Sequence, residues 1–91
     1  MIPKNRQPTP PGEVLLEEFL KPLCMSQVEA AQRMGIPLNR LNEVIHSKRG
    51  ITADTALRLA RLLNTSPEFW MNLQTASDLY HASRALELAE A

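Results

Sequence analysis

Residues 27–44 read QVEAAQRMGIPLNRLNEV, and the spacing of the small and apolar residues in this stretch predicts two helices joined by a tight turn. Gly35 falls between the two helices, where a left-handed backbone conformation favours glycine. Ala31 provides the small side chain that lets the helices approach where they cross. Three apolar residues pack the second helix onto the first: Ile36, Leu41 and Val44. The opposite face of the second helix is therefore expected to point outward.

That outward face carries polar side chains suited to the edges of DNA bases. They are Asn39, Arg40, Asn42 and Glu43. Asparagine pairs bidentately with adenine, arginine pairs bidentately with guanine, and glutamate accepts a hydrogen bond from cytosine. We expect Asn39 and Arg40, close to the start of the helix, to be the main base readers. Asn42 and Glu43 are further candidates on the same face.

Two pairs of residues flank this face and are expected to bind phosphate groups. Ser26 and Gln27 open the first helix, whose free N–H groups attract anions. Ser26 and Glu29 also have the Ser-x-x-Glu spacing of a capping box. Lys48 and Arg49 follow the second helix. The helix pair would thus hold the DNA backbone on both sides of the base readers.

The distribution of charge supports this interpretation, although the whole chain has a formal net charge of zero. Residues 33–50 contain four basic residues and one acidic residue, a local excess of three positive charges, whereas both flanks are net negative. Binding to phosphate responds to this local potential. The same residues would also suit an ordinary solvated surface, because many helical bundles that never meet DNA contain a glycine turn.

The rest of the chain predicts a single all-α domain of five helices. Four prolines lie in residues 1–11, which we expect to form an extended arm, leaving residues 12–91 as the domain. The first helix is expected over residues 13–20, ending before Pro22, and the second helix of the pair is expected from Ile36–Pro37 to about Ser47. A fourth helix is expected to begin after a Thr52 cap. The last helix is expected to run from a Ser66 cap to about Glu90. No segment shows the alternation of a β-strand.

The last helix is expected to serve both the core and a dimer. Phe69 and Trp70 are predicted to point inward. Leu79, Leu86 and Leu88 extend the apolar character beyond what a core of one 91-residue chain needs. This predicts a C-terminal dimerisation helix, and a two-fold dimer would place two recognition helices about 34 Å apart, one turn of DNA.

Composition argues against an enzyme, a metal site and a bound cofactor. The single cysteine, Cys24, excludes an intramolecular disulfide, and we expect it to be a small buried hydrophobe. His46 and His81 belong to different predicted helices, and no cluster of metal ligands or activated nucleophile is apparent. No apolar run approaches the roughly 20 residues of a membrane span, and the N-terminus is unlike a signal peptide. We expect a cytoplasmic protein.

Two stretches resemble a known family: PGEVLLEEFLKPLCMSQVEAA (11–31) and GIPLNRLNEVIHSKRGITADTALRLARLLNTSPEFWMNLQ (35–74). They are similar to the HigA/VapI-type antitoxins of the Cro/C1 (XRE) helix-turn-helix superfamily, and the resemblance extends from Pro11 to about Tyr80. It implies a lambda-repressor-like domain, a homodimer, and repression through a palindromic operator in the protein's own promoter. It also implies pairing with a HigB-type toxin, a small RelE-like ribonuclease that cleaves mRNA. The same DNA-binding roles fall on Ser26, Gln27, Asn39, Arg40, Asn42, Lys48 and Arg49. Met25–Ser26 and Leu38 occupy variable positions, so the operator sequence cannot be predicted.

Two other functions remain open at this point. The chain could be chiefly a protein-binding module with weak DNA binding, since its neutral charge and negative flanks suit a basic partner. It could also be a solitary phage-type repressor without a toxin. The neighbouring gene would separate these alternatives.

Overall fold

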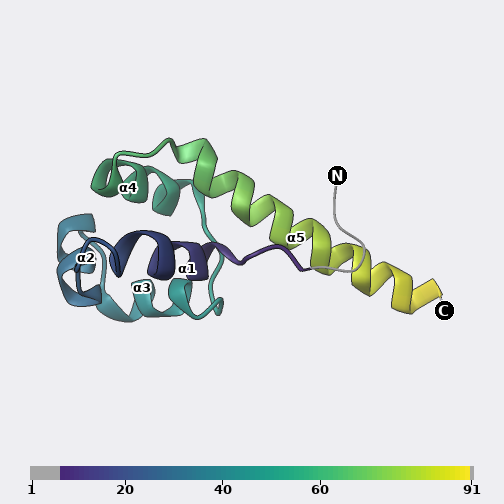
Figure 1. The fold of residues 1–91 in the computed structure, drawn as a ribbon. Helices are drawn as coiled ribbons and strands as arrows, with labels where there is room; N and C mark the ends of the chain where they lie inside the picture. The colour runs from purple at the N-terminus through teal and green to yellow at the C-terminus, as the bar shows by residue number, and fades with distance from the viewer. Residues whose placement is uncertain (1–6, 91) are drawn as a thin grey trace.

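The computed structural model describes residues 7–90, and within this part of the chain every regular element is a helix, with no strand (Figure 1). Its elements are α1 (Pro11–Val14), the π-helical segment η1 (Leu15–Leu20), α2 (Gln27–Met34), α3 (Leu38–Ile45), α4 (Ala53–Leu63) and α5 (Pro67–Glu90). Because α1 continues directly into η1, the predicted all-α fold of five helices is confirmed. Residues 1–6 of the predicted arm lie outside the described residues, and α1 begins at Pro11, the arm's last predicted residue.

The first helical stretch differs from its prediction in its hydrogen bonding. The Lys21 N–H donates to the Leu16 carbonyl oxygen at 3.0 Å, a bond that spans five residues and marks a π-helix. A turn then leads to α2, and in it Cys24 has a φ of 54°. Cys24 is exposed, so our expectation of a buried cysteine was wrong. Its place in an exposed turn outside the helix explains the difference.

The predicted packing of α2 against α3 is confirmed residue by residue. Ala31 is buried where the helices meet, and Gly35 ends α2 with a φ of 72°, in the left-handed region. Ile36, Leu41 and Val44 are all buried. The α3 helix itself is shorter than expected, because it ends at Ile45 and Ser47 takes a φ of 60°. The turn that leaves α3 therefore begins before the Lys48–Gly50 segment predicted to close it.

A glycine that sequence reasoning overlooked brings α1 against the end of α3. Gly12 is buried, and a Cβ atom there would collide with the carbonyl oxygens of Val44 and Ile45. Backbone packed against backbone leaves no room for any side chain. This contact fixes the end of α3, from which the predicted phosphate-binding segment departs.

The core lies between α5 and the shorter helices. Its most deeply buried large side chains are Trp70, Leu15, Leu20, Leu41 and Leu59. The Trp70 indole N–H donates to the Thr65 hydroxyl at 2.7 Å, so its one polar group is satisfied. Phe69 is 38% exposed, and the prediction that it points inward was wrong. Its ring lies edge-on to Trp70 at the margin of the core.

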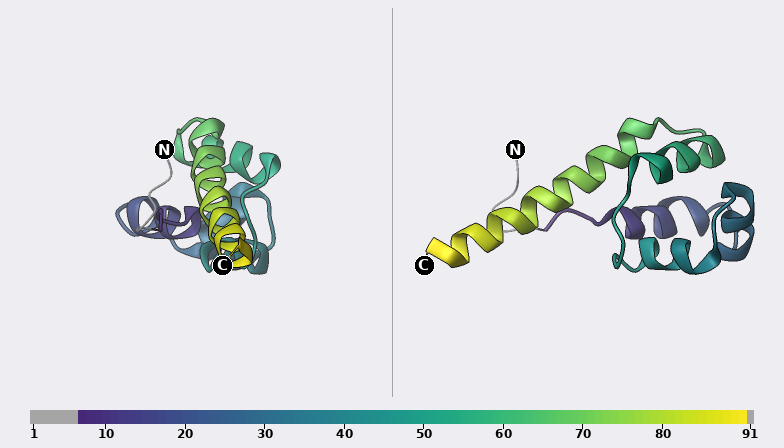
Figure 2. Two further views of the ribbon diagram at one scale, coloured as in Figure 1. Left: turned by 90° about the vertical axis from the view of Figure 1, so that its right-hand side faces the viewer. Right: turned by 180° about the vertical axis from the view of Figure 1, so that it is seen from behind.

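The α5 helix spans 24 residues and extends well beyond the rest of the domain (Figures 1 and 2). It begins after Ser66, whose hydroxyl accepts a hydrogen bond from the Phe69 N–H at 3.1 Å, as the predicted cap requires. Residues 81–90 are exposed along their whole length. None of the helices between residues 7 and 90 combines the length and apolar character that a membrane crossing needs.

Candidate nucleic-acid interface

The N-terminus of α2 is open to solvent and partly capped as predicted. The Ser26 hydroxyl accepts a hydrogen bond from the Glu29 N–H at 3.0 Å. The Glu29 carboxylate forms an ion pair with Arg33 of the next turn, at 3.5 Å. This ion pair replaces the second hydrogen bond of the predicted capping box, from the Ser26 N–H to the Glu29 carboxylate. The N–H groups of Gln27 and Val28 precede the first intrahelical bonds. They remain available to an anion at this end of the helix.

The N-terminus of α3 lies beside that of α2 and has no side-chain cap. Pro37 sets the extended backbone that starts the helix but offers no capping oxygen, which explains why no cap was evident in the sequence. Asn39, in the first turn, is exposed as predicted. One face of the domain therefore presents two helix N-termini together.

A hydrogen bond between side chains joins these two helices at that face. The Asn42 amide nitrogen donates to the Gln27 amide oxygen at 3.3 Å. This leaves the Gln27 amide nitrogen and the Asn42 amide oxygen free to meet another donor or acceptor. Two residues predicted as DNA contacts, 15 positions apart, are thus held in one cluster.

Arg40 does not project outward as expected. Its guanidinium donates to the Asp54 carboxylate at 2.8 Å and to the Thr55 hydroxyl at 2.9 Å, both on α4. Arg40 lies four residues before the buried Val44, which places it at the edge of the packed face of α3. In this structure Arg40 ties α3 to α4, and a base contact would require it to leave that carboxylate.

Asp54 is the centre of this tie between helices. It also accepts a hydrogen bond from the Arg58 guanidinium at 2.9 Å, and Arg58 in turn donates to the Met34 carbonyl oxygen at the end of α2 at 2.7 Å. Hydrogen bonds from Arg40 and then Arg58 hold the pKa of the Asp54 carboxyl below its ordinary value. The cluster links α2, α3 and α4, and local sequence patterns do not predict it.

The predicted phosphate-binding segment after α3 is held by its own ion pair. The Arg49 guanidinium donates twice to one carboxylate oxygen of Glu43, at 2.9 and 3.1 Å. Glu43, a predicted base reader, is therefore engaged with Arg49. Lys48 is exposed and has no ion pair within residues 7–90. Of the four basic residues in 33–50, Lys48 thus presents the freest positive charge.

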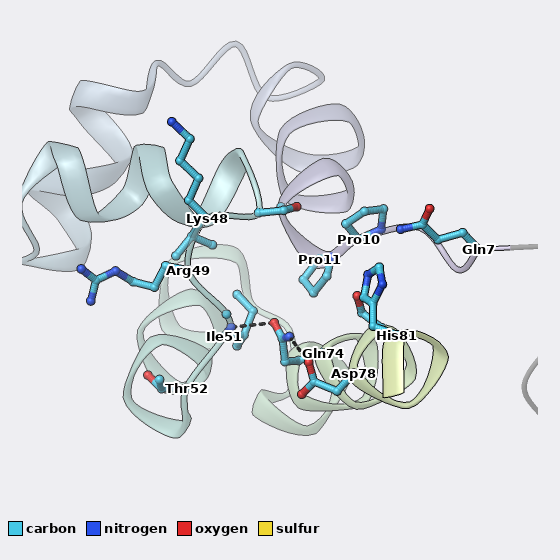
Figure 3. Close-up of a pocket in the computed structure, with 15 residues that line it drawn as sticks. Gln7, Pro10, Pro11, Lys48, Arg49, Ile51, Thr52, Gln74, Asp78 and His81 are labelled. Atoms are coloured by element: carbon cyan, nitrogen blue, oxygen red, sulfur yellow. Dashed lines mark hydrogen bonds between the residues drawn. The ribbon is translucent and has the colours of Figure 1, made fainter. Parts of the chain in front are cut away.

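A hollow of about 490 Å³ lies behind this segment (Figure 3). Pro10 and Pro11 line one side, and Gln74 and His81 of α5 line another. The Gln74 side-chain oxygen accepts from the Ile51 N–H at 2.7 Å, which fixes the α3–α4 loop to α5 (Figure 3). Sequence reasoning gave no sign of this contact, because glutamine on a long helix is ordinarily a solvated residue. Within residues 7–90, no three metal-binding side chains gather into a site.

Comparison with known proteins identifies this arrangement. A helix-turn-helix family model matches residues 16–70. Virulence-associated protein I of Dichelobacter nodosus is 45% identical over 82 residues, which cover 89% of this chain and 76% of that protein. The chain belongs to the HigA-type antitoxin family of helix-turn-helix proteins. The family predicted from the sequence is thereby confirmed, and it is a family of regulators and antitoxins, not of enzymes.

Solved structures of HigA-type proteins share the whole fold. The structure of a HigA-family addiction module antidote protein from Coxiella burnetii has a TM-score of 0.82 at 45% identity and covers 88% of this chain and 87% of its own. Antitoxin HigA of Pseudomonas aeruginosa, solved with the higBA promoter, has a TM-score of 0.84 at 39% identity and covers 87% and 86%. The latter protein is a relative solved together with promoter DNA.

Proposed function

We propose that this HigA-type protein binds, as a homodimer, a palindromic operator in its own promoter and represses transcription from it. The observation that carries the proposal is the pair of exposed helix N-termini on one face, joined by the hydrogen bond between Gln27 and Asn42. Such a face offers amide groups for base edges and free N–H groups for phosphates. A relative of the same fold was solved with promoter DNA, which supports the assignment.

The individual roles follow from the geometry of this face. Asn39 is the principal base reader, and Asn42 with Gln27 reads a neighbouring base or its phosphate. Ser26 and Lys48 bind phosphates on either side. Arg40, Glu43 and Arg49 are assigned to the same face, and each reaches DNA by exchanging its present ion pair for a base or a phosphate.

The proposed homodimer is supported by the exposed end of α5. Leu79 is 49% exposed and Leu86 is 61% exposed, and a separation of seven positions is nearly two helical turns, so the two share one stripe. Leu88 lies about 200° around the helix from Leu86, on another side. A two-fold axis along the Leu79–Leu86 stripe would bury apolar surface that one chain leaves in water.

The partner that this antitoxin would neutralise is a HigB-type toxin, a small RelE-like ribonuclease, encoded beside it. The support is the family itself, together with a curated relative named antitoxin HigA-1 in Vibrio cholerae. A basic ribonuclease would also suit the net-negative segments on either side of residues 33–50. Co-expression with the neighbouring gene and co-purification of a one-to-one or two-to-two complex would test the pairing.

One observation favours a second candidate, a protein-binding module that contacts DNA only weakly. Three of the four basic residues in 33–50 form ion pairs within the chain, which reduces the positive charge available to phosphates. A fluorescence anisotropy titration decides between the two. It compares a duplex from the gene's own upstream region with a scrambled duplex of the same composition, at two salt concentrations.

Each outcome of this titration has a clear meaning. We expect selective binding to the upstream duplex with a dissociation constant on the order of 10 nM or tighter, weakened steeply by salt. Equal, weak binding to both duplexes would overturn the repressor proposal and favour the protein-binding module.

A further inference from the structure

Two large apolar side chains lie exposed among the polar groups of the α2–α3 face. Val28 is 51% exposed and Leu38 is 46% exposed. They lie in the first turns of α2 and α3, and both line one shallow hollow of about 540 Å³. The remaining residues that line this hollow are Ser26, Gln27, Asn39 and Asn42. An apolar patch is thus enclosed by the groups assigned to DNA.

Packing within the chain does not account for these two side chains. Their neighbours Ala31 and Leu41 are turned into the core, whereas Val28 and Leu38 face away from it. The hydrogen bond between Gln27 and Asn42 joins α2 to α3 beside Val28 and Leu38, so the hollow has a defined shape set by the helix pair. Exposed apolar groups that converge on a binding face usually have an apolar partner.

The DNA major groove offers one apolar group, the C5-methyl of thymine. Cytosine carries hydrogen at that carbon, and the purine edges present only donors and acceptors. Asn39 lines the same hollow as Leu38 and suits adenine, so the two residues together match A·T pairs. The chemistry of the hollow therefore favours a thymine methyl over any other group on the duplex edge.

We propose that Leu38 and Val28 form a pocket for a thymine methyl group, so that each half-site of the operator contains one thymine recognised by its methyl alone. This inference rests on the proposed DNA binding and specifies which base the protein selects there. It assigns sequence specificity to two residues without polar atoms in their side chains, in contrast to the base readers named above.

The test replaces each thymine of the upstream duplex in turn by deoxyuridine, which removes only the methyl group. The protein is unchanged, so its folding cannot confound the result. We expect one position in each half-site to lose affinity by about fourfold, the value of one buried methyl-sized group, while other positions change much less. If every uracil duplex binds as tightly as the thymine duplex while the scrambled duplex is still rejected, the inference fails and the proposed function stands.

Two variants locate the effect on the protein. Leu38→Asn should bind the thymine and uracil duplexes equally. Leu57→Asn makes the same change on α4, at a leucine that is 50% exposed and does not line the hollow, and it should keep the fourfold preference. Preference retained by Leu38→Asn would contradict the assignment. A wild-type chain that does not prefer the upstream duplex would overturn the proposed function and this inference with it.

Discussion

The two halves of α5 belong to one helix but lie in different surroundings. Over residues 67–80, Trp70 is fully buried and Gln74 holds the α3–α4 loop. Over residues 81–90 every side chain is exposed, and the helix extends away from the domain (Figure 2). A helix that projects into water gains little from tertiary packing, which provides most helical stability in proteins. The first half thus stabilises the single chain, whereas the second half adds little to it and carries Leu86 of the proposed dimer contact.

Truncation of Trp70 should show most strongly how differently the two halves of α5 contribute to the free energy of unfolding. Trp70→Ala empties the centre of the core and leaves the Thr65 hydroxyl without its donor, so we expect a loss of about 3–5 kcal/mol in the free energy of unfolding. Chemical denaturation followed by circular dichroism measures it. The matched change in the distal half, Leu88→Ala, should stay within about 0.5 kcal/mol. Similar losses for both variants would remove the distinction between the two halves.

Gln74 tests whether the proximal half also orders the α3–α4 loop. Gln74→Ala leaves the Ile51 N–H without its acceptor in a partly buried site, with an expected cost of about 1–3 kcal/mol. Asn72→Ala, at an exposed position on the same helix, is the control and should be near neutral. Amide hydrogen exchange should show faster exchange at Ile51 in the Gln74 variant alone. Unchanged exchange there would mean that α5 does not hold the loop.

The distal half is tested by a change that spares the folded chain. Leu86→Asp should alter the free energy of unfolding of dilute protein by no more than about 0.5 kcal/mol, because Leu86 is exposed in the single chain. It should nevertheless weaken the proposed dimer, as seen by sedimentation equilibrium over a range of concentrations. Leu88→Asp, on another side of the helix, should weaken it less. A dimer unaffected by Leu86→Asp would place the two-fold contact elsewhere.

The smallest effect expected is the response to acid, which arises outside α5. Asp54 has its pKa lowered by Arg40 and Arg58, so its contribution to stability is present above its ordinary pKa of 3.8 and is lost as the pH falls through the lower folded value. Asp54→Asn should therefore reduce the difference in stability between neutral and strongly acidic pH. Its carboxylate is exposed, so the change should be slight. A variant with the same acid response as the wild type would show that the cluster contributes nothing measurable.

The features that sequence reasoning predicted well are local. The Ser26 cap, the left-handed Gly35 and the buried faces of α2 and α3 depend on residues within a few positions of one another. Spacing and residue type suffice for such features, because helix geometry converts them directly into position. Asn39 was placed correctly on the exposed face for the same reason.

The features that were missed depend on contacts across the fold. Arg40 was expected to face solvent but pairs with Asp54, 14 residues away on another helix. The close approach of Gly12 to α3 and the capture of Ile51 by Gln74 likewise follow from how the helices pack. Cys24 was misjudged because it lies in the turn after the first helical stretch, outside the helix, where its side chain is exposed. No local pattern contains this information.

The central claim is that the α2–α3 face reads a DNA sequence, and the most direct test is the ratio of affinities for the upstream and scrambled duplexes. Asn39→Ala, which removes the exposed side chain proposed as the principal base reader, should lower this ratio by about tenfold, within the 1–3 kcal/mol of one good base contact. Lys48→Ala should weaken binding to both duplexes equally and leave the ratio unchanged. If Asn39→Ala leaves the ratio at the wild-type value while the protein remains folded, this face does not read DNA in the way described.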